Sequence, residues 1–387
     1  MYSLETVIEE NIAVALGSSA ESYRQRGDLK MSKKLYREAL KVREALSVLD
    51  KSYFQPLVVE TLERLAVLSV EENQYAEAIG YYRRAMEGLE ELARVLPQRY
   101  TQRLIKGYTT VGDLYRKSLQ YREAERFYQK VITLYQGFTP EELEATRLKR
   151  LHLYLNYALV LRQRNQFDLT KEAYMGALNI YGTLIEEGSS QYREEMATTL
   201  FDLGTLYFEH HRQNKAGEVF LLVLEMLLSL PESGQRNYPI LAKSFYLLAQ
   251  IYTAQLEYVD GVAAYRESLK YYIALADEQP LVYGTTVAEV FADLARCYDQ
   301  QDKKMLAQHF QEKVILLYTE LNHYHQFKYD FELAQSIVQQ VDAYGAHTIW
   351  LHQAVGILMR HEGNSNAQAL LDRIHTLREK RCVTIKG

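Results

Sequence analysis

A column of small residues, the anchor column, recurs along this 387-residue chain at a nearly constant interval. Successive anchors are separated by 46, 46, 46, 46, 45 and 46 residues. The seven anchors are Ala20, Ala66, Gly112, Ala158, Gly204, Ala249 and Ala295. A fixed period of this size is typical of repeat architectures, in which each unit buries its apolar face only against its neighbours. The sequence therefore predicts an array of stacked units.

Other apolar columns keep the phase of the anchors. Sixteen residues after an anchor the chain has an aromatic residue in six units and Gln311 in the seventh. These aromatic residues are Tyr36, Tyr82, Tyr128, Tyr174, Phe220 and Tyr265. Around the third anchor, Tyr108, Val111 and Tyr115 share one helical face with Gly112, and a second helical stripe begins twelve residues after each anchor. Each unit is therefore predicted to be a hairpin of two helices of about 18 residues.

Helix-breaking residues mark the expected boundaries between units. All six prolines are expected to fall between the end of one second helix and the start of the next first helix, because proline inside a helix costs about 3 kcal/mol. They are Pro56, Pro97, Pro140, Pro231, Pro239 and Pro280. Short polar segments such as residues 72–74 separate the two helices within a unit.

The order of small and aromatic residues resembles the tetratricopeptide repeat family over about residues 10–325. The clearest copy runs from Val111-Gly112-Asp113-Leu114-Tyr115 through Ala124 to Tyr128. The period exceeds the family norm of about 34 residues, and the family's early Trp is replaced by Leu, Tyr or Phe, so this chain resembles the extended-helix members. The resemblance implies an all-α fold, a right-handed superhelical α-solenoid.

The end of the chain departs from the repeat. Residues 1–327 are predicted to form seven helical hairpins, and residues 328–387 a degenerate repeat followed by capping helices. Residues 330–361 are expected to form an irregular hairpin split at Gly345 and containing Trp350, the single tryptophan. A last helix is expected to start at Ser365, with Gln368 completing a capping box. A terminal segment of this kind would give the array a polar end face.

Composition and charge exclude several classes of protein. The net charge of −5 lacks the basic excess of a nucleic-acid binder. The chain has no apolar run of about 18 residues, so no membrane span is predicted. Two cysteines cannot form a disulfide framework, which favours a reducing, cytoplasmic location. The first residues are acidic where a signal peptide would be basic. The first helix begins within the first dozen residues, so no separate amino-terminal effector segment is expected.

No catalytic signature stands out, and the sequence predicts neither an enzyme nor a cofactor. The neighbouring His210 and His211 would point about 100° apart on a helix and cannot share one metal ion. His323 and His325 are expected in a loop, and Cys297 is expected to pack between helices. No metal site is predicted.

In tetratricopeptide arrays the first helices line the concave surface. The resemblance implies that positions −3, +1 and +4 from each anchor face that groove. The predicted partner-binding residues are Arg116, Leu155, Arg162, Phe201, Phe208, Tyr246, Gln250 and Arg296. Leu155 and Phe201 could instead only pack first helices together. The Lys and Asn with which the family's chaperone-tail binders clamp a carboxylate are absent from the −3 and +1 columns.

The charge distribution suggests what such a ligand would carry. Residues 101–150 contain ten basic and six acidic residues, whereas residues 251–300 contain three basic and eight acidic ones. A ligand crossing both regions would be acidic toward the third and fourth repeats. The sequence thus predicts a non-catalytic scaffold or adaptor that binds a protein or peptide with an acidic segment. The alternative is a peptide-sensing regulator of the bacterial helical-repeat receptor type, and an enzyme built on the array is a weaker third.

Overall fold

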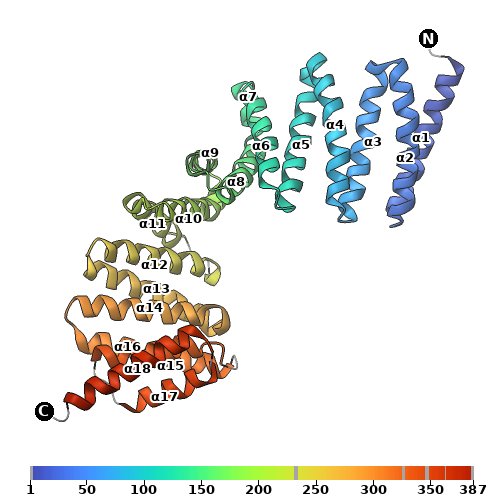
Figure 1. The fold of residues 1–387 in the computed structure, drawn as a ribbon. Helices are drawn as coiled ribbons and strands as arrows, with labels where there is room; N and C mark the ends of the chain where they lie inside the picture. The colour runs from blue at the N-terminus through green and yellow to red at the C-terminus, as the bar shows by residue number, and fades with distance from the viewer. Residues whose placement is uncertain (1–2, 231–233, 325–326, 345–347, 362, 385–387) are drawn as a thin grey trace. The chain divides into compact units, whose positions relative to one another are not determined.

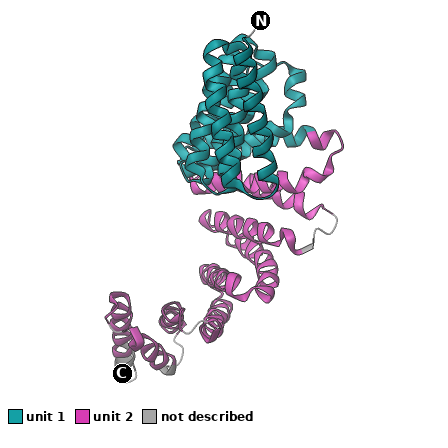
Figure 2. Cartoon of the chain, turned by 90° about the vertical axis from the view of Figure 1, so that its right-hand side faces the viewer, with its two compact units in different colours: residues 1–183 teal, residues 184–387 magenta. Residues whose placement is uncertain are grey.

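The computed structural model describes residues 3–230, 234–324, 327–344, 348–361 and 363–384. Throughout these ranges the secondary structure is helical, with no strand (Figure 1). The chain forms two compact units, residues 1–183 and 184–387 (Figure 2). The prediction of an all-α solenoid of stacked hairpins is confirmed. The division after residue 327 into repeats and a cap stays a prediction.

The first unit contains four successive helical hairpins. Their helices are α1 (Leu4–Gln25), α2 (Leu29–Leu49), α3 (Lys51–Glu71), α4 (Tyr75–Val95), α5 (Pro97–Lys117), α6 (Tyr121–Tyr135) with the short α7 (Pro140–Ala145), α8 (Arg147–Gln163) and α9 (Phe167–Glu186). Several helices span 21 or 22 residues, longer than the predicted 18. Apart from α7, two helices of this unit are shorter: α8 has 17 residues, and α6, the second helix of the third hairpin, stops after 15.

The second unit continues the pattern of hairpins and then changes it. Its helices are α10 (Arg193–Glu209), α11 (Gln213–Leu228), α12 (Tyr238–Ala254), α13 (Tyr258–Glu278), α14 (Pro280–Gln300), α15 (Lys304–Tyr324), α16 (Asp330–Tyr344), α17 (Thr348–Leu358) and α18 (Ser365–Thr384), with short 3₁₀ helices at 190–192, 234–237 and 359–361. Residues of α16, α17 and α18 share one buried apolar cluster with α14 and α15. Gly345, the predicted split, lies outside the described residues.

Every hairpin turns in the same way. The residue seven positions after the anchor has a left-handed backbone, with φ between 55° and 83° in all seven hairpins of the described chain. These residues are Gly27, Asn73, Leu119, Asn165, His211, Leu256 and Asp302. In each turn the next amide donates to a carbonyl five residues back, as in Gln120 N to Tyr115 O at 2.9 Å. This bond satisfies a carbonyl that the ending helix would otherwise leave unpaired.

The anchor column lies against the aromatic column of the same hairpin. Tyr128 is fully buried, and its ring faces Gly112 so closely that a Cβ there would lie 2.7 Å from Cε1. Gly204 stands in the same relation to Phe220, at 2.8 Å. Small anchors therefore let an aromatic ring from the second helix reach the backbone of the first.

Two predictions about helix boundaries are wrong in detail. Pro56 lies inside α3, because the Asp50 carboxylate caps the helix by accepting from Tyr53 N at 3.2 Å and starts it before the proline. Pro97, Pro140 and Pro280 do begin helices, and Pro239 is second in α12; Pro231 lies outside the described residues. The predicted box at Ser365 is replaced by Asn364, whose side chain accepts from Asn366 N, while Gln368 donates to Asp372.

Candidate partner-binding surfaces

In the first unit, polar bonds join the first helix of one hairpin to the first helix of the next. Arg24 on α1 pairs with Glu71 on α3 at 2.7 Å, and Arg103 on α5 pairs with Glu63 on α3 at 2.6 Å. The side chains of α1, α3 and α5 on this side form what we call the first-helix face. Because these bonds connect neighbouring repeats, they fix the spacing between successive first helices.

Two clefts open on the first-helix face. One, of about 260 Å³, lies between α1 and α3 over Tyr36; the other, of about 490 Å³, lies between α3 and α5 over Tyr82. Burial, and then a hydrogen bond to Glu21, raise the pKa of Tyr36 to about 12. Burial, followed by the nearby Glu63 carboxylate, also raises the pKa of Tyr82. Both phenols therefore stay protonated and give each cleft a neutral polar floor.

Charged side chains rim the larger cleft. Glu60, Arg64 and Lys106 line it together with the paired Glu63 and Arg103. Arg64 and Lys106 lie two and six residues before their anchors and are not among the residues predicted from the sequence. The sequence could have indicated them, because positions −6, −3, −2 and +1 from an anchor fall on one face of a helix of period 3.6.

The three predicted site residues of the first unit are half-buried: Arg116 on α5, and Leu155 and Arg162 on α8. Arg116 lies beside the hydroxyl of Tyr128, which donates to Asp113 at 2.5 Å. The Nε of Arg116 is buried and has no hydrogen-bond partner among the described residues. Arg116 is thus more integrated into the hairpin than a solvated arginine would be.

In the second unit, two predicted residues meet at a buried carboxylate. Asp293 on α14 accepts from Tyr265 at 3.2 Å and forms an ion pair with Arg296. Tyr246 is only 8% exposed, and its pKa is raised by burial and then by Asp293. Burial also raises the pKa of Cys297 to about 11, which leaves its thiol protonated and unreactive. Asp293 was missed because it lies two residues before its anchor, outside the expected columns.

The remaining predicted residues of this unit are Phe201, Phe208 and Gln250. All three are half-buried. The ring of Phe201 lies 6.0 Å from that of Phe220, so it packs on the aromatic column.

The described histidines considered as metal ligands lie in a turn or at the end of a helix. Within the described ranges no group of three His, Cys, Asp or Glu residues could hold a metal ion. His211 is the left-handed residue of its turn, and His323 lies in the last turn of α15 rather than in the predicted loop. His325 is outside the described residues. None of the described helices is long and apolar enough to cross a membrane.

Comparison with known proteins agrees with this geometry. The tetratricopeptide repeat model matches residues 13–46 and 105–138. A solved structure of the C-terminal part of a TPR repeat-containing protein from Cytophaga hutchinsonii is 17% identical, covers 80% of this chain and 98% of its own, and has a TM-score of 0.50. No curated protein sequence matches the chain.

Two further solved structures are similar at lower scores. The apo form of RapI is 14% identical, covering 80% of this chain and 99% of that one at a TM-score of 0.40. YrrB, described as a TPR protein with an unusual peptide-binding site, is 15% identical, covering 65% and 91% at a TM-score of 0.35.

The fold is that of a tetratricopeptide-repeat array, and two segments of the chain match the tetratricopeptide repeat itself. The two matched segments fall in the first hairpin, α1 with α2, and in the third, α5 with α6. The chain carries tetratricopeptide repeats in a helical scaffold of the kind used for protein interaction.

Proposed function

We propose that this chain is a non-catalytic scaffold or adaptor that binds a protein or peptide partner along its first-helix face. The observation that carries the proposal is the pair of clefts on that face, each open between neighbouring first helices and floored by a neutral phenol. Grooves between repeated helices accept peptides and helices through side-chain pockets. We also propose that the chain is located in the cytoplasm and binds no nucleic acid.

The chemistry of the larger cleft supports a partner with an acidic segment. Glu63 is neutralised by Arg103, whereas Lys106 is exposed and has no ion-pair partner among the described residues. Arg64 reaches Glu60 only at 3.9 Å, with both side chains 49% exposed, so this pair is weak. A carboxylate of the partner can therefore compete for both cations.

Affinity purification tests the proposal with a matched control. The double variant Arg64→Glu with Lys106→Glu should lose the partners that the wild-type chain retains, while its thermal stability stays unchanged because both side chains are exposed. Lys117→Glu, an exposed cation of α5 outside the cleft, should retain them. An unchanged partner set in the double variant would remove the first-helix face from consideration.

The residues predicted from the sequence stay a proposed partner-binding set, but of these only Arg116 lies on the helices of the first-helix face, and it makes a weaker probe. Charge reversal at Arg116 introduces a carboxylate next to Asp113 and the buried Tyr128 hydroxyl. Arg116→Glu with Arg162→Glu is therefore expected to lower stability as well as binding.

Small-angle scattering with short peptides separates a scaffold from a peptide-sensing regulator, since only the regulator should change its dimensions on binding.

A further inference from the structure

The second helices of the first unit enclose two clefts built from the same repeat positions. The α2–α4 cleft lies over α3 and occupies about 530 Å³; the α4–α6 cleft lies over α5 and occupies about 740 Å³. Residues lining the second are mostly those 46 positions after residues lining the first. An ion pair crosses each: Arg84 with Glu44, and Lys130 with Glu90 at 3.0 Å. The two clefts can therefore be compared position by position.

Polar side chains cross one end of the α2–α4 cleft. Lys51 on α3 pairs with Glu91 on α4 at 2.8 Å, and the Gln55 side chain lies against Gly88. Forty-six residues later Pro97, Gly137 and Thr101 replace Lys51, Glu91 and Gln55, so neither the ion pair nor the long amide can form there.

The α4–α6 cleft is open because its second helix ends early. α6 stops at Tyr135, and Thr139 then caps the separate helix α7 by accepting from Glu142 N, with Pro140 in its first turn. A residue before proline is disfavoured in the helical conformation, so α6 could not have run on through Thr139 as α4 does at the matching position. The corresponding part of α4 continues to Val95.

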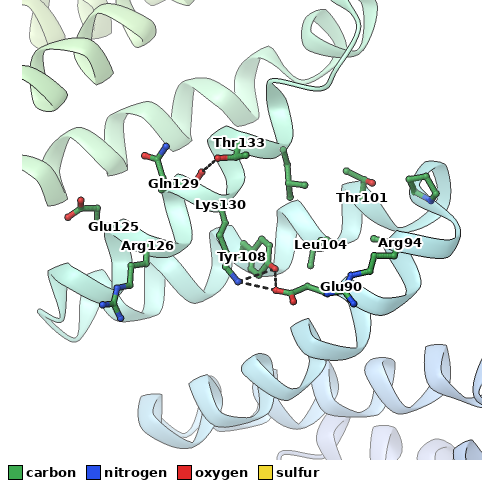
Figure 3. Close-up of a pocket in the computed structure, with 13 residues that line it drawn as sticks. Glu90, Arg94, Thr101, Leu104, Tyr108, Glu125, Arg126, Gln129, Lys130 and Thr133 are labelled. Atoms are coloured by element: carbon green, nitrogen blue, oxygen red, sulfur yellow. Dashed lines mark hydrogen bonds and ion pairs between the residues drawn. The ribbon is translucent and has the colours of Figure 1, made fainter.

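Apolar groups line the opened part of this cleft. They are Ala93, Pro97, Leu104 and Leu134, beside the ring of Tyr108. Tyr108 donates to Glu90, and Lys130 Nζ lies 4.6 Å from the centre of the Tyr108 ring (Figure 3). Although burial opposes ionisation, the hydrogen bonds from Tyr108 and Lys130 lower the pKa of Glu90 overall. The Tyr108–Glu90–Lys130 group is thus satisfied internally, with its charges cancelled.

Two arginines add an uncompensated positive charge. Arg94 and Arg126 line the α4–α6 cleft; 46 positions earlier the chain has Val48, which lines the α2–α4 cleft, and Gly80, which does not. Both are exposed, and in the described part of the chain neither forms an ion pair. The other acid of the cleft, Glu125, is neutralised by Arg164. Figure 3 shows Arg126 and Arg94 on opposite sides of the Tyr108–Glu90–Lys130 group.

We propose that the α4–α6 cleft is a second binding site, for a peptide segment in which acidic residues stand on both sides of a bulky apolar residue. The apolar side chain packs against Leu104, Pro97 and Leu134, and the flanking carboxylates pair with Arg94 and Arg126. The α2–α4 cleft lacks both arginines and has the Lys51–Glu91 pair across its end, so we expect it not to bind such a segment. This site lies on the second-helix side and is separate from the first-helix face.

A randomised 12-residue peptide library displayed on phage tests the proposal against the full chain. Selected peptides should be enriched in an apolar residue flanked by Asp or Glu, and their affinity should be measured by fluorescence polarisation. Arg94→Val with Arg126→Ala should weaken binding about tenfold or more. Thr133→Glu, which installs the residue of the other cleft, should weaken it similarly by repelling the carboxylates.

Matched controls separate this site from the first-helix face. Glu87→Thr makes the reverse exchange in the α2–α4 cleft and should leave binding unchanged. Arg64→Glu with Lys106→Glu alters only the first-helix face and should also leave these peptides bound. Selected peptides without the acidic–apolar pattern, or peptides whose affinity responds only to the first-helix variant, would overturn the second site while leaving the proposed function intact.

Discussion

Gly112 and Tyr128 approach each other more closely than any larger anchor would allow. A Cβ on Gly112 would lie 2.7 Å from Cε1 and 2.9 Å from Cδ1 of the Tyr128 ring. The ring has little freedom to withdraw, because it is fully buried and its hydroxyl donates to Asp113 at 2.5 Å. The third hairpin therefore depends on the absence of a single methyl group.

Adding that methyl group, and then a larger side chain, should progressively destabilise the protein. We expect Gly112→Ala to lower the free energy of unfolding by about 1–2 kcal/mol and Gly112→Leu by about 3 kcal/mol or more, because overpacking forces the ring and backbone apart. Chemical denaturation followed by circular dichroism measures both. Gly80→Ala is the control: Gly80 is exposed in α4 with open space around its Cβ position, so stability should rise by about 0.5–1 kcal/mol. Equal stability of Gly112→Leu and the wild type would contradict the packing.

Two leucines in the hairpin turns should be replaceable by glycine with a gain in stability. Leu119 and Leu256 have φ of 59° and 66°, and each side chain is 71% exposed. A left-handed backbone costs an ordinary L-residue about 1 kcal/mol, whereas glycine adopts it freely. Leu119→Gly and Leu256→Gly should therefore each raise the free energy of unfolding by about 0.5–1 kcal/mol. The reverse exchange, Gly27→Leu, should lower the melting temperature; a rise would disprove the argument.

The ion pairs of a buried lysine should make the protein less stable as the pH becomes acidic. Lys33 on α2 donates to Glu72 at 2.8 Å and also contacts Gln74 and Glu77. Burial acts to raise the pKa of Glu77, but the hydrogen bonds from Lys33 and Arg37 outweigh it and lower this pKa below its ordinary 4.5. Glu77 thus contributes stability above the unfolded pKa, and this contribution disappears as pH falls through the lowered folded value.

Removing the lysine should remove part of that dependence. Lys33→Met leaves the carboxylates without their shared cation and should cost about 2 kcal/mol near neutral pH, less than a fully buried pair because the Glu77 side chain is 32% exposed. Melting temperatures measured from about pH 7 to pH 3 should converge at the acid end. Parallel curves for variant and wild type would show that the pair does not act in this way.

The carboxylate of Asp330 should hold α16 against the last 3₁₀ turn. It is 1% exposed and accepts from Asn322 at 3.2 Å, Arg360 at 3.3 Å and His361 at 3.1 Å. Asp330→Asn should cost about 2 kcal/mol or more and speed hydrogen exchange in α16 and α17. The exposed pair of Asp342 with Arg373 supplies the comparison, and Asp342→Asn should cost no more than about 0.5 kcal/mol. Similar losses of stability in the two variants would show that the buried Asp330 carboxylate does not hold these elements together.

The hairpin array could be predicted because its signal is repeated. The small and aromatic columns mark residues in direct contact, such as Gly112 and Tyr128, and the same helix positions recur in each hairpin. The helix face that lines the clefts could have been read from the same period, but the differences between one cleft and the next could not be predicted in this way. They depend on where one helix ends, as at Tyr135, and on long side chains such as Arg103 whose partners lie on a neighbouring repeat. Single positions of that kind carry no periodic signal.

The identical turns have a consequence for how the chain would respond to force. Cross-repeat bonds of the first unit, such as Arg24 with Glu71, join neighbouring hairpins. Because such partly exposed pairs are weak and each hairpin contacts only its neighbours, a pull on the two ends would meet a series of similar, weakly coupled barriers rather than one large barrier. Each hairpin that yields would release up to about 150 Å of extended chain. The molecule would lengthen in even steps and shorten again as the hairpins re-form.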